Sequence, residues 1–384
     1  MPAQRLTEAF KEFIDNEKSS GLVLIACTVI ALLIANSHLN PLYLNTIHAS
    51  ILGLSLEHWV NDGLMAVFFL FIGLELEREL YNGELSDLKQ AMLPIAAAIG
   101  GVAVPALIHL YFNFGLPTQA GIGIPMATDI AFAIGVLSML GNRIPTSLKV
   151  FVVAFAIADD LIAIIIIALF YSNSIAIPYL LAALATIAVL ALFNKMRIMS
   201  LVPYLLGGAI LWFLMLKSGI HATVAGVVLA FTIPFSGNTD QHSPSHNLEH
   251  MLHLPIAYFI LPIFALVNTG VVINPNWSTE LLSSNSLGII LGLVLGKPLG
   301  ILMASMLAIK MKITKLPDDL TLPHLFGAGL LGGIGFTMSI FIGNLAFYGE
   351  ADTINASKMA ILVASLIAGG LGYCWLKVVG KRNT

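Results

Sequence analysis

The stretch "AFAIADDLIAIIIIALF", residues 154–170, places two adjacent carboxylates, Asp159 and Asp160, inside an otherwise unbroken apolar run. An ionised Asp at the centre of a membrane helix costs about 2.5 to 3.5 kcal/mol on insertion scales, and a second negative charge beside it adds repulsion. One such carboxylate could be structural. Two neighbours, about 100° apart around a helix, are more typical of side chains that line a site. The pair therefore predicts a functional site.

Composition indicates that this run is a membrane helix. The chain has 384 residues, of which 58% are hydrophobic and 10% charged, whereas an ordinary soluble domain is roughly 25% charged. No basic patch indicates nucleic-acid binding. The sequence predicts an all-α polytopic membrane protein with about twelve spans, each long enough for the ~30 Å hydrocarbon layer. They lie near residues 20–36, 59–76, 91–112, 120–140, 150–171, 177–193, 201–216, 220–235, 251–272, 287–309, 325–347 and 356–379.

Basic residues in the connections predict the orientation. When the loops are numbered alternately, 15 of the 18 basic residues fall on one side, and only Lys217 and Lys358 on the other. Basic residues collect on the cytoplasmic side of short loops. We therefore expect an even number of spans and both termini in the cytoplasm. The long outer connection, about residues 37–58, contains "LNTIHASILGLSLEHW", which alternates loosely enough to form a short hairpin.

Few ionisable residues fall inside the predicted spans. Besides the aspartate pair they are Asp62, Asp129 and Lys297, with Glu75 and Glu79 at a cytoplasmic end. Such residues usually face a bundle interior or a water-filled cavity. Lys297 lies about ten residues into its span, which is deep for a lysine that snorkels to the surface. We expect its partner to be a buried carboxylate or a helix C-terminus, with snorkelling as the alternative.

Two spans are interrupted by glycine or proline. They are "GIGIPMATDIAFAIG" at 121–135, which contains Asp129, and "FGAGLLGGIGFTMSIFIG" at 326–343. Interrupted spans in the two halves of a transporter indicate discontinuous helices with binding groups at the break. Asp129 could offset positive helix N-termini there, and Lys297 negative C-termini. The alternative is that the glycines only allow close helix packing.

Two adjacent carboxyl groups in a low-dielectric cavity titrate as a coupled unit. Oxygen ligands suit a small hard cation, and they bind it only when deprotonated, so that the cation and the proton compete. Competition of this kind predicts an exchanger, not an enzyme, and no cofactor is expected.

The sequence resembles the NhaA-type bacterial sodium/proton antiporter family over nearly its whole length. The motifs that carry the resemblance are "FFLFIGLELEREL" at 68–80, "GIPMATDIAFAIGVL" at 123–137, "AIADDL" at 156–161, "KSGIHATVAG" at 217–226, "LEHMLH" at 248–253, "GKPLGI" at 296–301 and "GGIGFTMSIFI" at 332–342.

The resemblance implies a single transporter domain, 1–384, with twelve spans in the bacterial inner membrane. Spans 3–5 and 10–12 would form an inverted-repeat core in which unwound spans 4 and 11 cross. It implies pH-regulated, electrogenic export of Na⁺ or Li⁺ in exchange for H⁺ by alternating access. The hairpin at about 42–59 would join a homodimer.

The resemblance also implies roles for particular residues. Asp159 and Asp160 would bind Na⁺ and protons with help from Thr128, Asp160 being the more direct cation ligand. Asp129 and Lys297 would compensate charge at the crossing. A pH-sensing cluster would comprise Glu75, Arg78, Glu79, Glu249, His250 and His253, beside which this chain adds an acid, Glu77.

Two other classes share some of these features. A sodium-coupled symporter of a small organic solute could use the same architecture, but it needs a larger polar or aromatic pocket than this small central set suggests. An intramembrane aspartyl protease also uses buried aspartates. Its glycine-preceded Asp is missing, since Ala158 precedes Asp159 and Thr128 precedes Asp129.

Overall fold

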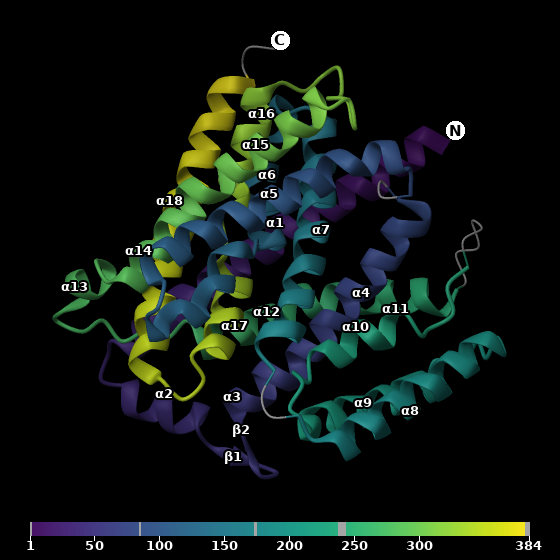
Figure 1. Ribbon diagram of the computed structural model, residues 1–384, viewed down its shortest axis with the longest axis vertical. Helices are drawn as coiled ribbons and strands as arrows, with labels where there is room; N and C mark the ends of the chain where they lie inside the picture. Colours follow the sequence, from purple (N-terminus) through teal and green to yellow (C-terminus); the bar gives the residue numbers. More distant parts are fainter. Residues whose placement is uncertain (1, 84–85, 173–174, 237–242, 381–384) are drawn as a thin grey trace. The chain divides into compact units, whose positions relative to one another are not determined.

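The computed structural model describes residues 2–83, 86–172, 175–236 and 243–380, and most of them are helical (Figure 1). In the first half the elements are α1 Pro2–Ala35, α2 Asn40–Ile47, β1 Ser50–Ile51, β2 Leu54–Ser55, α3 Leu56–His58, the π-helical η1 Trp59–Leu64, α4 Met65–Asn82, α5 Leu88–Asn113, the 3₁₀-helical η2 Pro117–Met126, α6 Ile130–Met139, the 3₁₀-helical η3 Gly141–Arg143, α7 Thr146–Phe170 and α8 Ile177–Lys195. The second half continues with α9 Val202–Ser218, α10 Val224–Ala230, α11 Pro244–Pro255, the π-helical η4 Ile256–Ile260, α12 Leu261–Asn268, α13 Trp277–Leu281, α14 Ser284–Leu291, the π-helical η5 Gly292–Gly296, α15 Lys297–Lys310, α16 Leu322–Gly332, α17 Phe336–Ala346 and α18 Ala351–Val379.

The helices are those of a multi-pass membrane protein. Among the described residues, seven helical runs are long and apolar enough to cross a membrane, and the number reaches ten when three bent pairs each count as one span. Every predicted span overlaps at least one helix. The all-α polytopic class is therefore confirmed, and the count of twelve spans stays a prediction.

The chain divides into two compact units. The first comprises residues 1–39, 87–163 and 268–384. Within it, α5 packs against α14 and α15, α1 against α6, and α18 against α14 and α16. Gly100 and Gly300 set the closeness of α5 and α15, because a Cβ on either would collide with the backbone carbonyl of the other. This contact fixes the first turn of α15, which carries Lys297.

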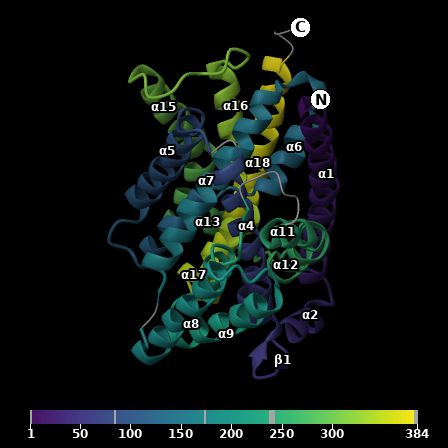
Figure 2. The same ribbon diagram turned by 90° about the vertical axis from the view of Figure 1, so that its right-hand side faces the viewer.

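The second unit comprises residues 40–86 and 164–267. In it α4 packs against α10 and α11. Helix α8 runs beside α9, as Figures 1 and 2 show. Its buried core includes Leu74, Leu190, Tyr204 and Leu229. This unit carries the acidic cluster on α4 and α11 described below.

The predicted hairpin is present but shorter than expected. Strands β1 and β2 pair antiparallel, with Ser50 opposite Ser55 and Ile51 opposite Leu54. Leu52 and Gly53 form the turn with φ of 53° and 85°, the backbone twist that two-residue hairpins favour. The preceding residues 42–47 belong to α2 and are helical. A role of the hairpin in dimer formation stays a prediction.

Both interrupted spans are broken helices. Segments η2 and α6 meet at a bend of 41°, and α16 and α17 at a bend of 49°. Between η2 and α6, Ala127 and Asp129 are extended, with ψ of 149° and 102°. Between α16 and α17 the chain runs through Gly333 and Gly335. The first half of the fourth predicted span is a 3₁₀ helix, a tighter form than the expected α-helix.

Candidate functional site

The aspartate pair lies in the middle of α7, in the first unit. Asp159 is 0% exposed and Asp160 1% exposed. Because they are consecutive on a helix, their carboxyl groups point about 100° apart and can reach different neighbours. Both charges are withdrawn from solvent, so a positive partner is needed if the pair is ionised.

Lys297 supplies a positive partner. Its Nζ lies 2.8 Å from Asp159 Oδ2, and both side chains are 0% exposed. Nζ also donates a hydrogen bond to the carbonyl of Met126, the last residue of η2. Lys297 therefore has both kinds of partner expected from the sequence, a buried carboxylate and a helix C-terminus. It follows directly after η5, and π-helical turns of this kind are frequent at functional sites.

One oxygen of Asp159 is left over. Within the residues that the structure describes, Asp159 Oδ1 has no hydrogen-bond partner, although it is buried. The Thr128 side chain neighbours this carboxyl group. The Thr128 hydroxyl donates 2.8 Å to the carbonyl of Gly332, which leaves its oxygen able to accept or coordinate. Oxygen atoms of this type are the ligands that a small hard cation prefers.

Asp129 makes hydrogen bonds at both helix breaks, the one before α6 and the one before α17. Its Oδ1 accepts from the amide of Phe132, at the start of α6, at 3.1 Å. Its Oδ2 accepts from the amide of Thr337, at the start of α17, at 3.0 Å, and from the Thr337 hydroxyl at 2.5 Å. The Asp129 amide donates 2.6 Å to the carbonyl of Ile334. One carboxylate thus faces two helix N-termini, which carry partial positive charge.

The charges of the central group fit a single monovalent ion. When Asp159, Asp160 and Lys297 are all ionised, their summed charge is −1. One monovalent cation neutralises it. Protons on the same two carboxyl groups remove the negative charge that attracts the cation, so that a buried site with this balance favours one kind of occupant over both in a low-dielectric interior.

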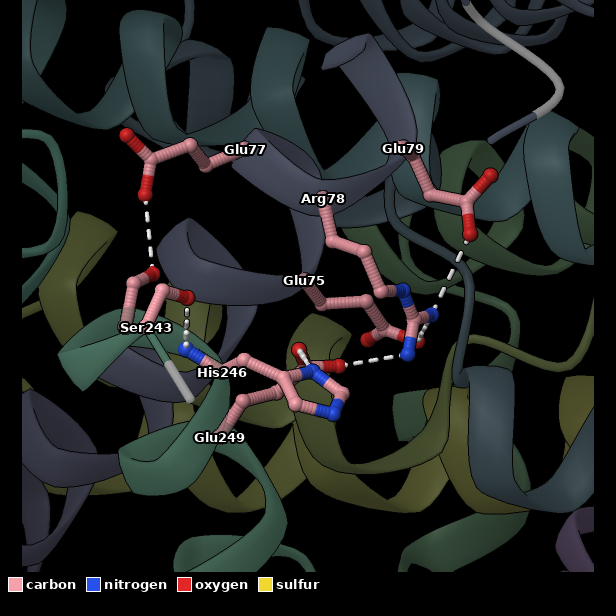
Figure 3. Close-up of polar contacts among 8 residues, drawn as sticks. Glu75, Glu77, Arg78, Glu79, Ser243, His246 and Glu249 are labelled. Carbon is pink, nitrogen blue, oxygen red and sulfur yellow. Dashed lines mark hydrogen bonds and ion pairs between the residues drawn. The ribbon is translucent and has the colours of Figure 1, made fainter. Parts of the chain in front are cut away.

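A second polar group lies on α4 and α11 of the second unit, with Arg78 at its centre (Figure 3). Arg78 Nη1 donates 2.6 Å to Glu249 Oε1, and Nη2 donates 3.1 Å to Glu79 Oε1. Glu75 Oε1 lies 3.6 Å from Arg78 Nη2. Three carboxylates thus share one guanidinium, and we call Glu75, Arg78, Glu79 and Glu249 the acidic cluster.

The two predicted histidines lie near this cluster, since His250 acts electrostatically on Glu249, and Arg78 acts on His253. His250 is exposed on α11, and His253 packs edge-on against Phe71, with ring centroids 5.9 Å apart. A residue outside the predicted set, His246, places Nδ1 3.8 Å from Glu249 Oε2. The i,i+3 spacing of His246 and Glu249 on one helix was the sequence signal for this pair.

The additional acid Glu77 has a separate partner. It points away from Arg78 in Figure 3, and its Oε2 accepts a 2.9 Å hydrogen bond from the Ser245 hydroxyl. Glu77 is buried. It therefore adds a buried acid beside the acidic cluster without sharing its cation.

The central ion pair leads to a prediction on stability. Lys297→Ala removes the cation from a buried carboxylate, a change that typically costs about 3 to 5 kcal/mol. We expect a large drop in thermal unfolding temperature in detergent. Lys310→Ala, at the exposed C-terminus of the same helix, is the matched control and should change little. Equal unfolding temperatures for both variants would show that the pair contributes no stability.

Comparison with known proteins gives the same assignment over the full chain. A family model described as Na⁺/H⁺ antiporter 1 matches residues 11–376. The Na(+)/H(+) antiporter NhaA of Dechloromonas aromatica is 63% identical over 381 residues, 99% of this chain and 98% of the relative. That of Flavobacterium psychrophilum is 56% identical over 379 residues, covering 99% and 98%. These relatives are antiporters, which decides against a symporter or a protease. The chain therefore belongs to the Na⁺/H⁺ antiporter 1 family, and it is a sodium/proton antiporter of the membrane.

Proposed function

We propose that Na⁺ and protons exchange at Asp159 and Asp160, with the Thr128 hydroxyl as a further ligand and with Li⁺ as an alternative cation. The observation that supports the proposal is the fully buried Asp159–Lys297 ion pair, in which Asp159 Oδ1 has no hydrogen-bond partner among the described residues. A cation that enters must take Asp159 from Lys297 or share it. A proton that enters weakens the same ion pair. Either occupant therefore changes the same contact.

Competition at one site couples the two flows. The carboxylates bind Na⁺ only when deprotonated, so that loading with Na⁺ requires loss of protons. If the site opens to one side of the membrane at a time, each cycle carries protons one way and the cation the other way. Since the pair can carry up to two protons and exchanges them for one cation, the cycle moves net charge. A membrane potential negative inside then drives Na⁺ outward.

Asp129 and Lys297 act in this scheme as charge compensation where spans 4 and 11 cross. Support comes from Asp129, which accepts from the first turns of α6 and α17, and from Lys297, which donates to the end of η2. Broken helices lose backbone partners at the break, and these side chains replace them. The scheme includes twelve spans, with spans 3–5 and 10–12 as an inverted repeat.

The acidic cluster, together with His250 and His253, is proposed as the pH sensor. Arg78 holds three carboxylates in one group, so that their protonation states are linked. His246, which faces Glu249, adds an imidazole to this group. We further propose a homodimer joined through the hairpin, and a location in the bacterial inner membrane with both termini in the cytoplasm.

Neutral variants of the pair test the proposed site. Asp160→Asn and Asp159→Asn keep the shape of each side chain but can neither ionise nor exchange a proton. Mutation of a residue that only hydrogen-bonds to a metal ligand typically lowers metal affinity or activity by about 10- to 100-fold. Loss of the ligand itself should therefore lower the exchange rate by at least about 100-fold. The assay is a pH-gradient dye in everted vesicles, to which Na⁺, Li⁺ or K⁺ is added.

The matched control is Asp352→Asn, an exposed aspartate in the first turn of α18, which should leave exchange unchanged. Expression is equalised by quantifying the protein in the vesicles. Near-wild-type Na⁺-driven proton movement in either pair variant would remove the site from Asp159 and Asp160.

A variant of the acidic cluster tests the proposed pH sensor. Arg78→Gln takes the shared cation from three carboxylates, which then keep protons to higher pH. Activation should move about one pH unit towards alkaline values, while the apparent Na⁺ affinity at alkaline pH stays fixed. Arg197→Gln, at an exposed position in the same unit, is the control. An unchanged pH profile for Arg78→Gln would exclude the acidic cluster as the sensor.

A further inference from the structure

Lys297 has an aromatic neighbour in addition to its polar ones. Its Nζ lies 5.8 Å from the centroid of the Phe155 ring, within the range in which an aromatic face attracts a cation. Phe155 precedes Asp159 by four residues on α7, so both side chains project from the same face of that helix. One helix thus presents Lys297 with a carboxylate and, one turn away, an aromatic face.

The Phe155 ring is held in place by glycines on two other helices. A methyl group on Gly332, at the end of α16, would lie 3.1 Å from Phe155 Cε1, and one on Gly101 of α5 would lie 3.3 Å from Cε2. The ring is 0% exposed. It also stacks on Phe151, with centroids 6.3 Å apart and planes 15° from parallel. The ring therefore has little freedom to leave Lys297.

The exchange cycle creates a need for such a neighbour. The inference rests on the proposed function, in which Na⁺ takes Asp159 from Lys297. Once Asp159 is engaged by Na⁺, the ammonium group loses its 2.8 Å ion-pair partner in a fully buried position. It keeps the carbonyl of Met126 and the charge of Asp160, which in the proposed site binds the same cation. Leaving a buried charge without its ion-pair partner is strongly unfavourable.

We propose that Phe155 is a positioning residue for exchange, whose ring face holds the Lys297 ammonium group while Asp159 is bound to Na⁺. The ring attracts the ammonium group through the negative potential of its face. The attraction is stronger for a desolvated cation. It matters most when Asp159 is bound to Na⁺ and no longer neutralises the ammonium group. Phe155 therefore stabilises the Na⁺-loaded state more than the state in which Lys297 and Asp159 are paired, and it raises the apparent affinity for Na⁺.

Graded fluorination separates this electrostatic role from simple packing. Phenylalanine carrying one, two or three ring fluorines at position 155 nearly keeps the shape of the ring but weakens the negative potential of its face. The apparent KM for Na⁺ should rise with each fluorine and reach about threefold to tenfold at three, while the maximal rate changes little. The measurement uses the full chain in vesicles with the pH-gradient dye.

Phe151 is the matched control. It lies one turn earlier on α7, is also buried and stacks on the same ring, and its fluorination should leave KM unchanged. A second pair of variants needs no modified amino acid: Phe155→Leu should raise KM for Na⁺ about threefold to tenfold at equal thermal stability to Phe151→Leu, which should not raise it. A rise confined to position 155 supports the proposal.

The opposite outcomes overturn it. An unchanged KM at position 155, or equal changes at positions 155 and 151, would reduce Phe155 to core packing. The two kinds of variant also distinguish an error about Phe155 from an error about the site. If Asp159→Asn abolishes exchange but fluorination at 155 has no effect, the proposed site is retained and the proposed role of Phe155 is wrong. If Asp159→Asn still exchanges Na⁺, the proposed site itself is wrong.

Discussion

A buried charge must have a partner, and the first unit of this antiporter is arranged around that constraint. Asp159 and Lys297 are both 0% exposed and 2.8 Å apart. Neither could stay ionised alone at this depth without a penalty of several kcal/mol. The adjacent Asp160 gives the group one more acid than base, and this excess makes the site receptive to a cation or a proton. One carboxylate paired with one ammonium group would be neutral and stable, and it would not attract a further cation or proton.

The broken helices provide the remaining compensation. Unwinding frees backbone groups that water cannot satisfy inside a membrane, so each break must find partners within the protein. Asp129 accepts from the first turns of α6 and α17, and Lys297 donates to the end of η2. Through Lys297, the pairing of Asp159 is linked to the geometry of a helix end. A change of occupant at the aspartates can therefore be transmitted to a break, which is the least regular part of the backbone.

Much of this site could be predicted from the sequence, because charged residues in a membrane span are expensive and rarely incidental. Asp159, Asp160, Asp129 and Lys297 were identified on that ground alone. The broken spans followed from glycine and proline. The partner of Lys297 could not be named from the sequence, because the residue pattern within one span does not show which aspartate of another span lies opposite. Asp159 is 138 residues away along the chain.

Other features lacked a distinguishing signal. Phe155 reads as ordinary apolar filler, because its role depends on where its ring face points. His253 shares a helix face with Glu249, and its ring packs on Phe71, while His246 makes the close contact with Glu249. Local spacing on α11 allowed either arrangement, and packing against α4 decided between them. The 3₁₀ form of η2 and the helical start of the hairpin segment were likewise decided by tertiary context and not by local preference.

The central claim is that Na⁺ and protons compete for one buried carboxylate pair, and proton release on Na⁺ binding tests it most directly. Calorimetric titration of the purified protein with Na⁺, in buffers of different ionisation enthalpy at one pH, counts the protons released. The account predicts that the observed heat varies linearly with buffer ionisation enthalpy, with a slope that corresponds to net proton release and that disappears in Asp160→Asn. Sodium binding whose heat is the same in every buffer, across the pH range in which exchange switches on, would contradict the competition.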